Sequence, residues 1–281
     1  LGEGVDGQSQ WISTVHSPVN LLHQTEVTPS SIDWDLVKSW LRTDLSKEDE
    51  DGLTSRLSFT GPKTLSNDTS SLVVINCKSR TLVQIDSGMA YATLSYVWGS
   101  STAVTDTYRA ADVALTQLPP TIEDSLLVCQ NIGYLYLWVD KYCIPQSDPA
   151  ERLRQIQRMD AIYANSSLTL VACAGKDPRY GLPGVTKPRQ QCPSVYIKGS
   201  GYLQEIPAVR DIKTSVWAQR AWTYQETLLS RRRLYFTDLQ LYFENSASVN
   251  CEWATLSEAK VAQEVPWIYS QDTWLRESSQ I

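Results

Sequence analysis

The stretch WAQRAWTYQETLLSRRRLYF, residues 217–236, combines a helical pattern with a following strand at 234–236. A helix over 217–229 places the large apolar residues on one broad arc, namely Trp217, Ala221, Trp222, Leu228 and Leu229. Glu226 lies at the edge of this arc, one turn after Trp222. A carboxylate beside an aromatic face is partly desolvated, which raises its pKa toward values useful in catalysis. The alternative is a core helix that carries a solvated glutamate.

Upstream of this stretch, apolar runs alternate with helical patterns. The runs at 91–97, 134–139 and 168–174 indicate strands, and 119–132 and 149–163 indicate helices. Strands that are apolar throughout and separated by helices are typical of a mostly parallel sheet covered on both faces. A hairpin at 71–85 precedes them. The sequence therefore predicts an α/β fold, a mostly parallel sheet flanked by helices.

The chain divides into three parts by pattern. Residues 1–70 form an N-terminal extension with one expected helix over 30–41. Residues 71–245 form the α/β domain, and this includes a loop-rich insert at 175–215 with several prolines and glycines. Residues 246–281 form a C-terminal extension.

Polar and aromatic residues follow two of the expected strands directly. In parallel sheets ligands bind beyond the carboxyl ends of the strands, so these residues are candidate ligand contacts. They are Ser95, Tyr96, Trp98 and Gly99 at the end of the first strand, and Asp140, Cys143, Ile144 and Gln146 after the second. The alternatives remain open: Asp140 caps a loop or helix, Gln146 ties its own loop, and the tryptophans belong to the core.

Composition excludes several classes of function. The net charge of −6 and the pI near 5.1 argue against a general nucleic-acid role, and no apolar run reaches membrane length. Six scattered cysteines without a CxxC pair suit a reducing cytoplasm. The only histidines are His16 and His23, which disfavours a histidine-based triad and a metal site. Cys143 consequently lacks a base that would make it a nucleophile.

Four sequence blocks together resemble one family. They are YATLSYVWG at 91–99, LWVDKYCIPQ at 137–146, IQRMDAIYANSSLTLVACAG at 156–175 and RAWTYQETLLSRRRLYF at 220–236. In order and spacing they closely resemble the fungal HET domain of heterokaryon-incompatibility proteins, over about residues 72–245. The resemblance implies a role in non-self recognition and programmed cell death.

The HET family is thought to be a remote relative of TIR domains, which implies a TIR- or flavodoxin-like sheet. Some TIR domains hydrolyse NAD with a glutamate on a helix near the sheet edge, and Glu226 is similar to that glutamate. NAD is then a substrate and not a retained cofactor. Tyr96, Trp98 or Trp222 would stack on its rings, and Arg220 would contact the pyrophosphate. The chain has no GxGxxG fingerprint, which disfavours redox use of NAD.

Two hypotheses follow. The first is an NAD glycohydrolase whose activity drives cell death, with Glu226 as the key carboxylate. The second is a non-enzymatic death-signalling module that binds partners or assembles with itself. In both cases the expected partners are a second copy of the chain and an upstream recognition protein, with NAD or a related nucleotide in the first. Neither nucleic acid nor a membrane is expected as a partner.

Overall fold

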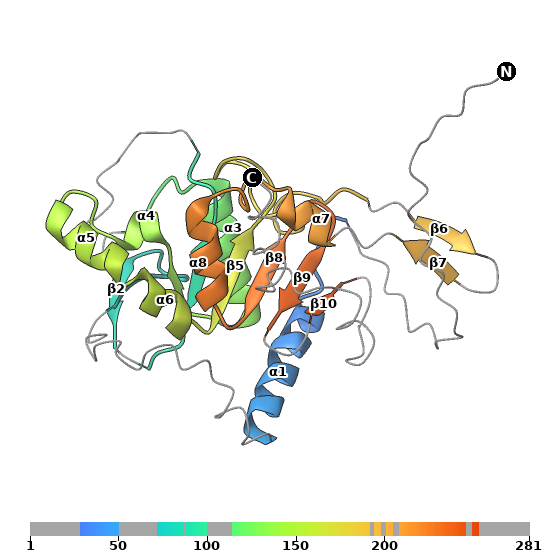
Figure 1. Ribbon diagram of the computed structural model, residues 1–281, viewed down its shortest axis with the longest axis horizontal. Coiled ribbons are helices and arrows are strands. Elements are labelled where there is room, and N and C mark those ends of the chain that lie inside the picture. Colours follow the sequence, from blue (N-terminus) through green and yellow to red (C-terminus); the bar gives the residue numbers. More distant parts are fainter. Residues whose placement is uncertain are drawn as a thin grey trace, which may run out of the picture.

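The computed structural model describes residues 29–50, 72–86, 88–99, 114–191, 194–197, 201–204, 208–245 and 249–252, and it is built on an eight-stranded sheet (Figure 1). The strand order is β10-β9-β8-β5-β3-β4-β1-β2. The strands are β1 (Leu72–Asn76), β2 (Leu82–Ile85), β3 (Ala92–Ser95), β4 (Tyr136–Trp138), β5 (Leu168–Ala172), β8 (Arg233–Phe236), β9 (Leu241–Glu244) and β10 (Val249–Cys251). A separate hairpin consists of β6 (Ser194–Ile197) and β7 (Gly201–Gln204).

The four central strands are parallel, as the sequence predicts. β3 pairs in parallel with β4 on one side and with β5 on the other, and β5 pairs in parallel with β8. Antiparallel strands then extend both edges, because β1 and β2 form the expected hairpin beside β4, and β9 and β10 follow β8. β10 lies in the part of the chain that the sequence assigns to a C-terminal extension, so that extension contributes a strand to the sheet.

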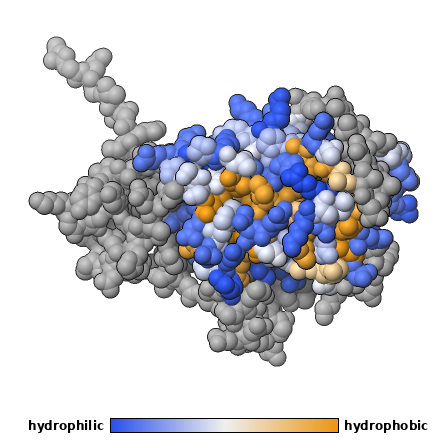
Figure 2. Space-filling model, turned by 180° about the vertical axis from the view of Figure 1, so that it is seen from behind, coloured by the Kyte–Doolittle hydropathy of each residue, from blue (hydrophilic) through white to orange (hydrophobic). Residues whose placement is uncertain are grey.

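Helices cover both faces of the sheet. They are α1 (Trp34–Glu50), α3 (Pro120–Ile132), α4 (Asp140–Cys143), α5 (Pro149–Gln157), α6 (Met159–Asn165), α7 (Ala208–Lys213) and α8 (Ala221–Leu229). α8 and α6 pack against each other in front of the sheet, and α3 lies behind it beside α1 (Figure 1). Seen from behind, hydrophobic patches remain on the surface between hydrophilic side chains (Figure 2). Among the described residues, no helix has the length and apolar character needed to cross a membrane.

Burial explains why the central strands are apolar throughout. Every residue of β3, β5 and β9 is buried, because helices or loops cover both faces. The main core contains large side chains such as Trp138, Ile122 and Leu94, all at most 1% exposed. A second, smaller cluster lies around Trp217, Tyr235 and Tyr242. Burial of this apolar area is the main favourable contribution to folding.

Local signals set most helix ends, with two differences from the sequence-based expectation. The expected helix over 30–41 begins later, because Asp33 itself accepts hydrogen bonds from the backbone N–H groups of Asp35 and Leu36, and it extends to Glu50. The expected helix over 149–163 is divided at Arg158, whose N–H bonds to the carbonyl of Gln155, three residues back. The arm expected over residues 1–28 lies outside the described residues.

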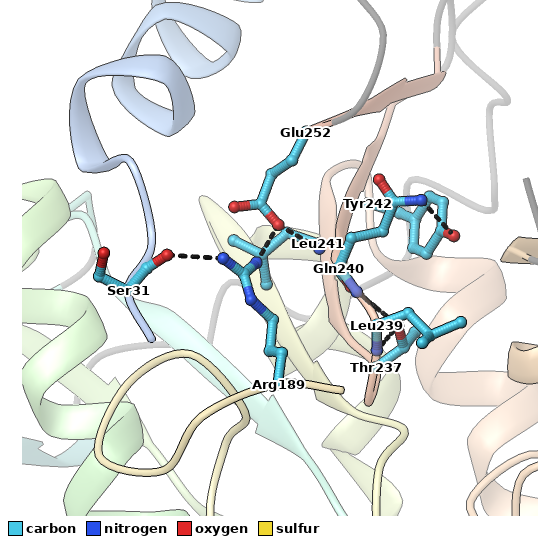
Figure 3. A network of polar contacts seen from close by, with 8 residues as sticks. All are labelled: Ser31, Arg189, Thr237, Leu239, Gln240, Leu241, Tyr242 and Glu252. Carbon is cyan, nitrogen blue, oxygen red and sulfur yellow. Dashed lines mark hydrogen bonds and ion pairs between the residues drawn. The ribbon is translucent and has the colours of Figure 1, made fainter. Parts of the chain in front are cut away.

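A buried ion pair joins three segments that are far apart in sequence (Figure 3). Arg189 of the insert pairs with Glu252, which follows β10, and donates 2.6 Å to the carbonyl of Ser31 before α1. Glu252 also accepts 2.7 Å from the N–H of Leu241 at the start of β9. Because both charged side chains are at most 5% exposed, each depends on the other to remain ionised in the core.

Candidate functional site

The carboxyl edge of the parallel strands holds most of the predicted site residues. The chain leaves β3 toward α3 and β4 on one side, whereas it leaves β5 toward the insert, α8 and β8 on the other. The carboxyl ends of β3 and β5 therefore form the point at which neighbouring connections diverge, which is where open α/β sheets bind ligands. Ser95 is the last residue of β3, and Asp140 follows β4.

Glu226 of α8 is buried against the end of β3. Its side chain is 4% exposed, and its carboxylate accepts a hydrogen bond from the hydroxyl of Ser95. The indole of Trp217 donates in turn to Ser95 Oγ at 2.7 Å. Indole, hydroxyl and carboxylate thus form one chain of hydrogen bonds within the core, and this chain fixes the carboxylate at the sheet edge.

Asp140 supplies a second carboxylate near the first. Its two oxygens accept from the indole of Trp98 at 3.0 and 2.9 Å, and Oδ1 also accepts from the N–H of Lys141 at 2.7 Å. Burial, followed by the negative charge of Glu226, raises the pKa of Asp140 to about 7 against these hydrogen bonds. Desolvation and the repulsion between the two acids therefore favour the protonated form of Asp140.

Arg220 supplies the positive charge beside the two acids. This residue precedes α8, is half-buried, and donates through its guanidinium to the carbonyl of Tyr96. Burial raises the pKa of Glu226, whereas the hydroxyl of Ser95 and the charge of Arg220 both lower it. The site therefore balances desolvation of two acids against one cation.

Two tyrosines complete the surroundings of the acids. The hydroxyl of Tyr163 donates to the carbonyl of Leu94 at 3.3 Å, and burial raises its pKa well above the usual value, as do the charges of Glu226 and Asp140. Tyr96 is 3% exposed, and within the described ranges its hydroxyl has no hydrogen-bond partner. A buried hydroxyl without a partner is uncommon and is available to a bound molecule.

The helical arc that the sequence predicts over 217–229 is wrong. The helix begins only at Ala221, so residues 217–220 form a turn and the position of Trp217 does not follow helical spacing. Trp217 is fully buried, whereas Trp222 and Leu228 are 53% and 45% exposed. The indole linked to Glu226 is consequently that of Trp217, through Ser95, and Trp222 lies on the surface.

The remaining predicted site residues lie apart from the acids or serve their own segment. Ile144 is 4% exposed in the core, and the side chain of Gln146 donates to the carbonyl of Ile144 at 3.0 Å. Cys143 is buried and accepts from the N–H of Val139, and burial raises the pKa of its thiol to about 12. A thiol with so high a pKa is a poor nucleophile. Gly99 is exposed, and its φ of +73° suits glycine.

Sequence reasoning did not assign Trp217 and Tyr163 to the site, although Tyr163 belongs to one of the blocks that carry the family resemblance. Their polar atoms reach Ser95 and the carbonyl of Leu94 on β3. They belong to the site because their side chains reach the end of β3 from segments that are distant in sequence. No local sequence pattern predicts such a contact. Among the described residues, no three histidine, cysteine or acidic side chains come together as metal ligands would.

The arrangement is that of an α/β domain with two acids, the buried Glu226 and the partly buried Asp140, at the carboxyl edge of its parallel strands. The family described as Heterokaryon incompatibility protein (HET) matches residues 91–226, from the start of β3 to Glu226. This part of the chain therefore matches a HET domain, and the match supports a role in heterokaryon incompatibility. No curated protein and no solved structure matches the chain, so the expected likeness to TIR domains stays a prediction.

Proposed function

We propose that this HET domain hydrolyses NAD at the bond between nicotinamide and ribose. One observation carries the proposal: the carboxylate of Glu226 is held at the carboxyl edge of the sheet by Ser95, with the second acid, Asp140, close enough to feel its charge. A pair of acids in a desolvated site attracts the positively charged nicotinamide ring and stabilises positive charge that develops on the ribose.

The reaction itself needs few groups. The bond between the pyridinium nitrogen and C1′ of the ribose breaks, its electron pair stays with nicotinamide, and nicotinamide leaves as a neutral base. Positive charge therefore moves to the ribose, where the ionised carboxylate of Glu226 stabilises it. Water then adds to C1′ and releases one proton to solvent, which gives ADP-ribose. No general acid is required at the leaving group.

The neighbours of Glu226 suit this reaction. Trp98 and Arg220 are half-buried, so an aromatic ring and a guanidinium border the acids on the solvent side. The indole would stack on a planar ring and the guanidinium would face the pyrophosphate. Because Glu226 is only 4% exposed, NAD must displace side chains to reach it, and self-association of the chain would supply that rearrangement.

Nicotinamide release tests the proposal. The full chain is incubated with NAD at several protein concentrations and in a cross-linked assembled form, and products are separated by chromatography. Glu226→Gln keeps the shape of the side chain but loses the charge, so we expect turnover to fall by about 100-fold or more. Glu123→Gln is the matched control, since Glu123 pairs with Arg80 away from the site. Release of no nicotinamide in any state, or an undiminished rate in Glu226→Gln, would refute the proposal.

A second function is favoured by the outer surface of α8, where Trp222 and Leu228 are exposed. Large exposed apolar side chains are typical of contact surfaces between proteins. In this reading the domain signals by assembling with itself, and Glu226 only supports the fold. Trp222→Ser would then abolish both self-association, measured by sedimentation, and cell death in a fungal host. Cell death that survives Trp222→Ser but is lost in a folded Glu226→Gln variant would instead favour the enzyme.

A further inference from the structure

A cavity of about 730 Å³ lies at the carboxyl ends of β5 and β8, and the acid pair does not line it. Its walls come from the residues after β5, from the end of α7 and the turn that follows, and from the turn between β8 and β9. Tyr180 and Gln190 of the insert close the remaining side. Cavities of this size hold small organic ligands.

The cavity comes close to the surroundings of the acid pair at two places. Ser215 and Val216 line the cavity, and the next residue, Trp217, donates to Ser95. On the other side, a Cβ atom on Gly99 would lie 2.9 Å from the Cβ of Asp177, so the loop after β3 touches the cavity wall. β5 and β8 are the first and second neighbours of β3 in the sheet. They therefore lie about 5 and 10 Å from β3. A dinucleotide is long enough to span both places.

The wall around Asp238 is held rigidly. The hydroxyl of Tyr180 donates to Asp238 at 2.6 Å, and the Lys187 ammonium lies 3.0 Å from the centre of the Tyr180 ring. Gly175, at a φ of +83°, lets the ring pack against the backbone, since a Cβ atom there would lie 2.2 Å from the ring. Thr237 accepts from two N–H groups of the turn that carries Asp238. This carboxylate is therefore presented in a fixed position.

The lining determines which ligand fits. Three acids and one lysine line the cavity, namely Asp177, Asp211, Asp238 and Lys176, and Arg179 pairs with Asp177. A phosphate placed against Asp238 would meet a carboxylate, whereas a hydroxyl group would find an acceptor there. Apolar side chains lie among the acids and offer contact to a flat base, and they include Ala174, Val216 and Leu239. A base joined to an unphosphorylated sugar matches both features.

We propose that this cavity holds the adenosine end of NAD, with Asp238 accepting a hydrogen bond from the ribose 2′-hydroxyl, an inference that rests on the proposed function. Carboxylates are the groups that recognise this hydroxyl in other dinucleotide sites. The 2′-phosphate of NADP would face the carboxylate of Asp238 instead, and repulsion between like charges would weaken its binding. The domain is therefore selective for NAD over NADP.

Adenosine tests the cavity alone, because it has the ribose diol but neither a phosphate nor a bond to nicotinamide. Calorimetric titration of the full chain should show binding, and 2′-deoxyadenosine should bind about 10-fold more weakly. Asp238→Asn should lower adenosine affinity by about 10-fold and remove the preference for the 2′-hydroxyl. The same variant should bind adenosine 2′-phosphate more tightly than the wild type does. Asp160→Asn, a half-buried acid outside the cavity, serves as the control.

A second variant keeps the test decisive if Asp238→Asn disturbs its turn. Leu239→Trp fills the cavity from the same turn and should abolish adenosine binding. The inference would be overturned, even if NAD is hydrolysed, if the wild type does not bind adenosine. It would also be overturned if both variants bind adenosine as tightly as the wild type does. Adenosine binding that responds to both variants without any nicotinamide release would instead support the cavity and refute the glycohydrolase.

Discussion

Replacing Asp140 with asparagine should stabilise the protein at neutral pH. Burial and the charge of Glu226 raise the pKa of Asp140 from 3.8 to about 7, so the folded protein holds this proton more tightly than the unfolded chain does. The free energy of unfolding must then fall as the pH rises from about 4 to about 7, and it stays lower above that range. Asparagine has no charge and keeps an acceptor for the N–H of Lys141.

The size of the effect follows from the pKa. A rise from 3.8 to about 7 corresponds to about 4 kcal/mol once the acid is ionised. Asp140 is partly exposed, and solvent screens its charge, so we expect a gain of about 2 to 4 kcal/mol above neutral pH. Near pH 4 the acid is protonated in the folded protein and about half ionised in the unfolded chain, so most of the gain should disappear.

Urea denaturation between about pH 4 and about pH 8 measures this difference, with tryptophan fluorescence as the signal. Asp86→Asn is the control, because Asp86 is exposed and its replacement should change the free energy of unfolding by less than about 0.5 kcal/mol at every pH. A gain that is the same at every pH, or a variant that is less stable than the wild type at about pH 8, would refute the electrostatic reasoning.

Three further substitutions test the fold. Arg189→Met leaves the buried Glu252 without its cation and should cost about 3 to 5 kcal/mol in urea denaturation. Gly175→Ala should cost more than about 1 kcal/mol, because the new Cβ atom would lie 2.2 Å from the Tyr180 ring and φ is +83°. Asp124→Ala removes the carboxylate that accepts from the insert loop at 182 and 186, and should lower stability by about 1 to 3 kcal/mol in a thermal melt.

Each of these substitutions has a matched control. Arg189→Met combined with Glu252→Leu should be less destabilised than Arg189→Met alone, and a cost equal to the sum of both would contradict the ion-pair argument. Gly133 has a similar φ of +93° with nothing within 4 Å of an added Cβ atom, so Gly133→Ala measures backbone strain alone. If Gly175→Ala costs no more than Gly133→Ala, the contact with Tyr180 is unimportant. Asp124→Asn keeps one acceptor and should cost less than Asp124→Ala.

The sequence predicts the central sheet well because strands buried on both faces must be apolar throughout. The runs at 91–97, 134–139 and 168–174 correspond to β3, β4 and β5, and the strand ends bring Ser95 and Asp140 to one edge of the sheet. The parallel pairing of these strands also follows from the helices between them. For these residues, local pattern and tertiary position agree.

The surroundings of Glu226 are predicted less well, because the start of α8 has no sequence signal. The residue before the helix is Arg220, which makes no side-chain capping bond, so the pattern over 217–229 reads as one continuous helix. Trp217 turns inward because the core around Tyr235 accepts its ring, at 6.1 Å between ring centres. Sequence reasoning also does not predict the cavity at β5 and β8, since its walls come from four segments that are distant in sequence.

The network of Arg189, Glu252 and Ser31 bears on how far the protein can be shortened. A fragment limited to the family match at 91–226 would lose β1 beside β4 and β8 beside β5. The apolar strands β4 and β5 would then become exposed edge strands, which promote aggregation. The smallest autonomous piece should instead extend from residue 29 to residue 252, because loss of Glu252 leaves the buried guanidinium of Arg189 without its anion, and loss of Ser31 removes a carbonyl that accepts from it.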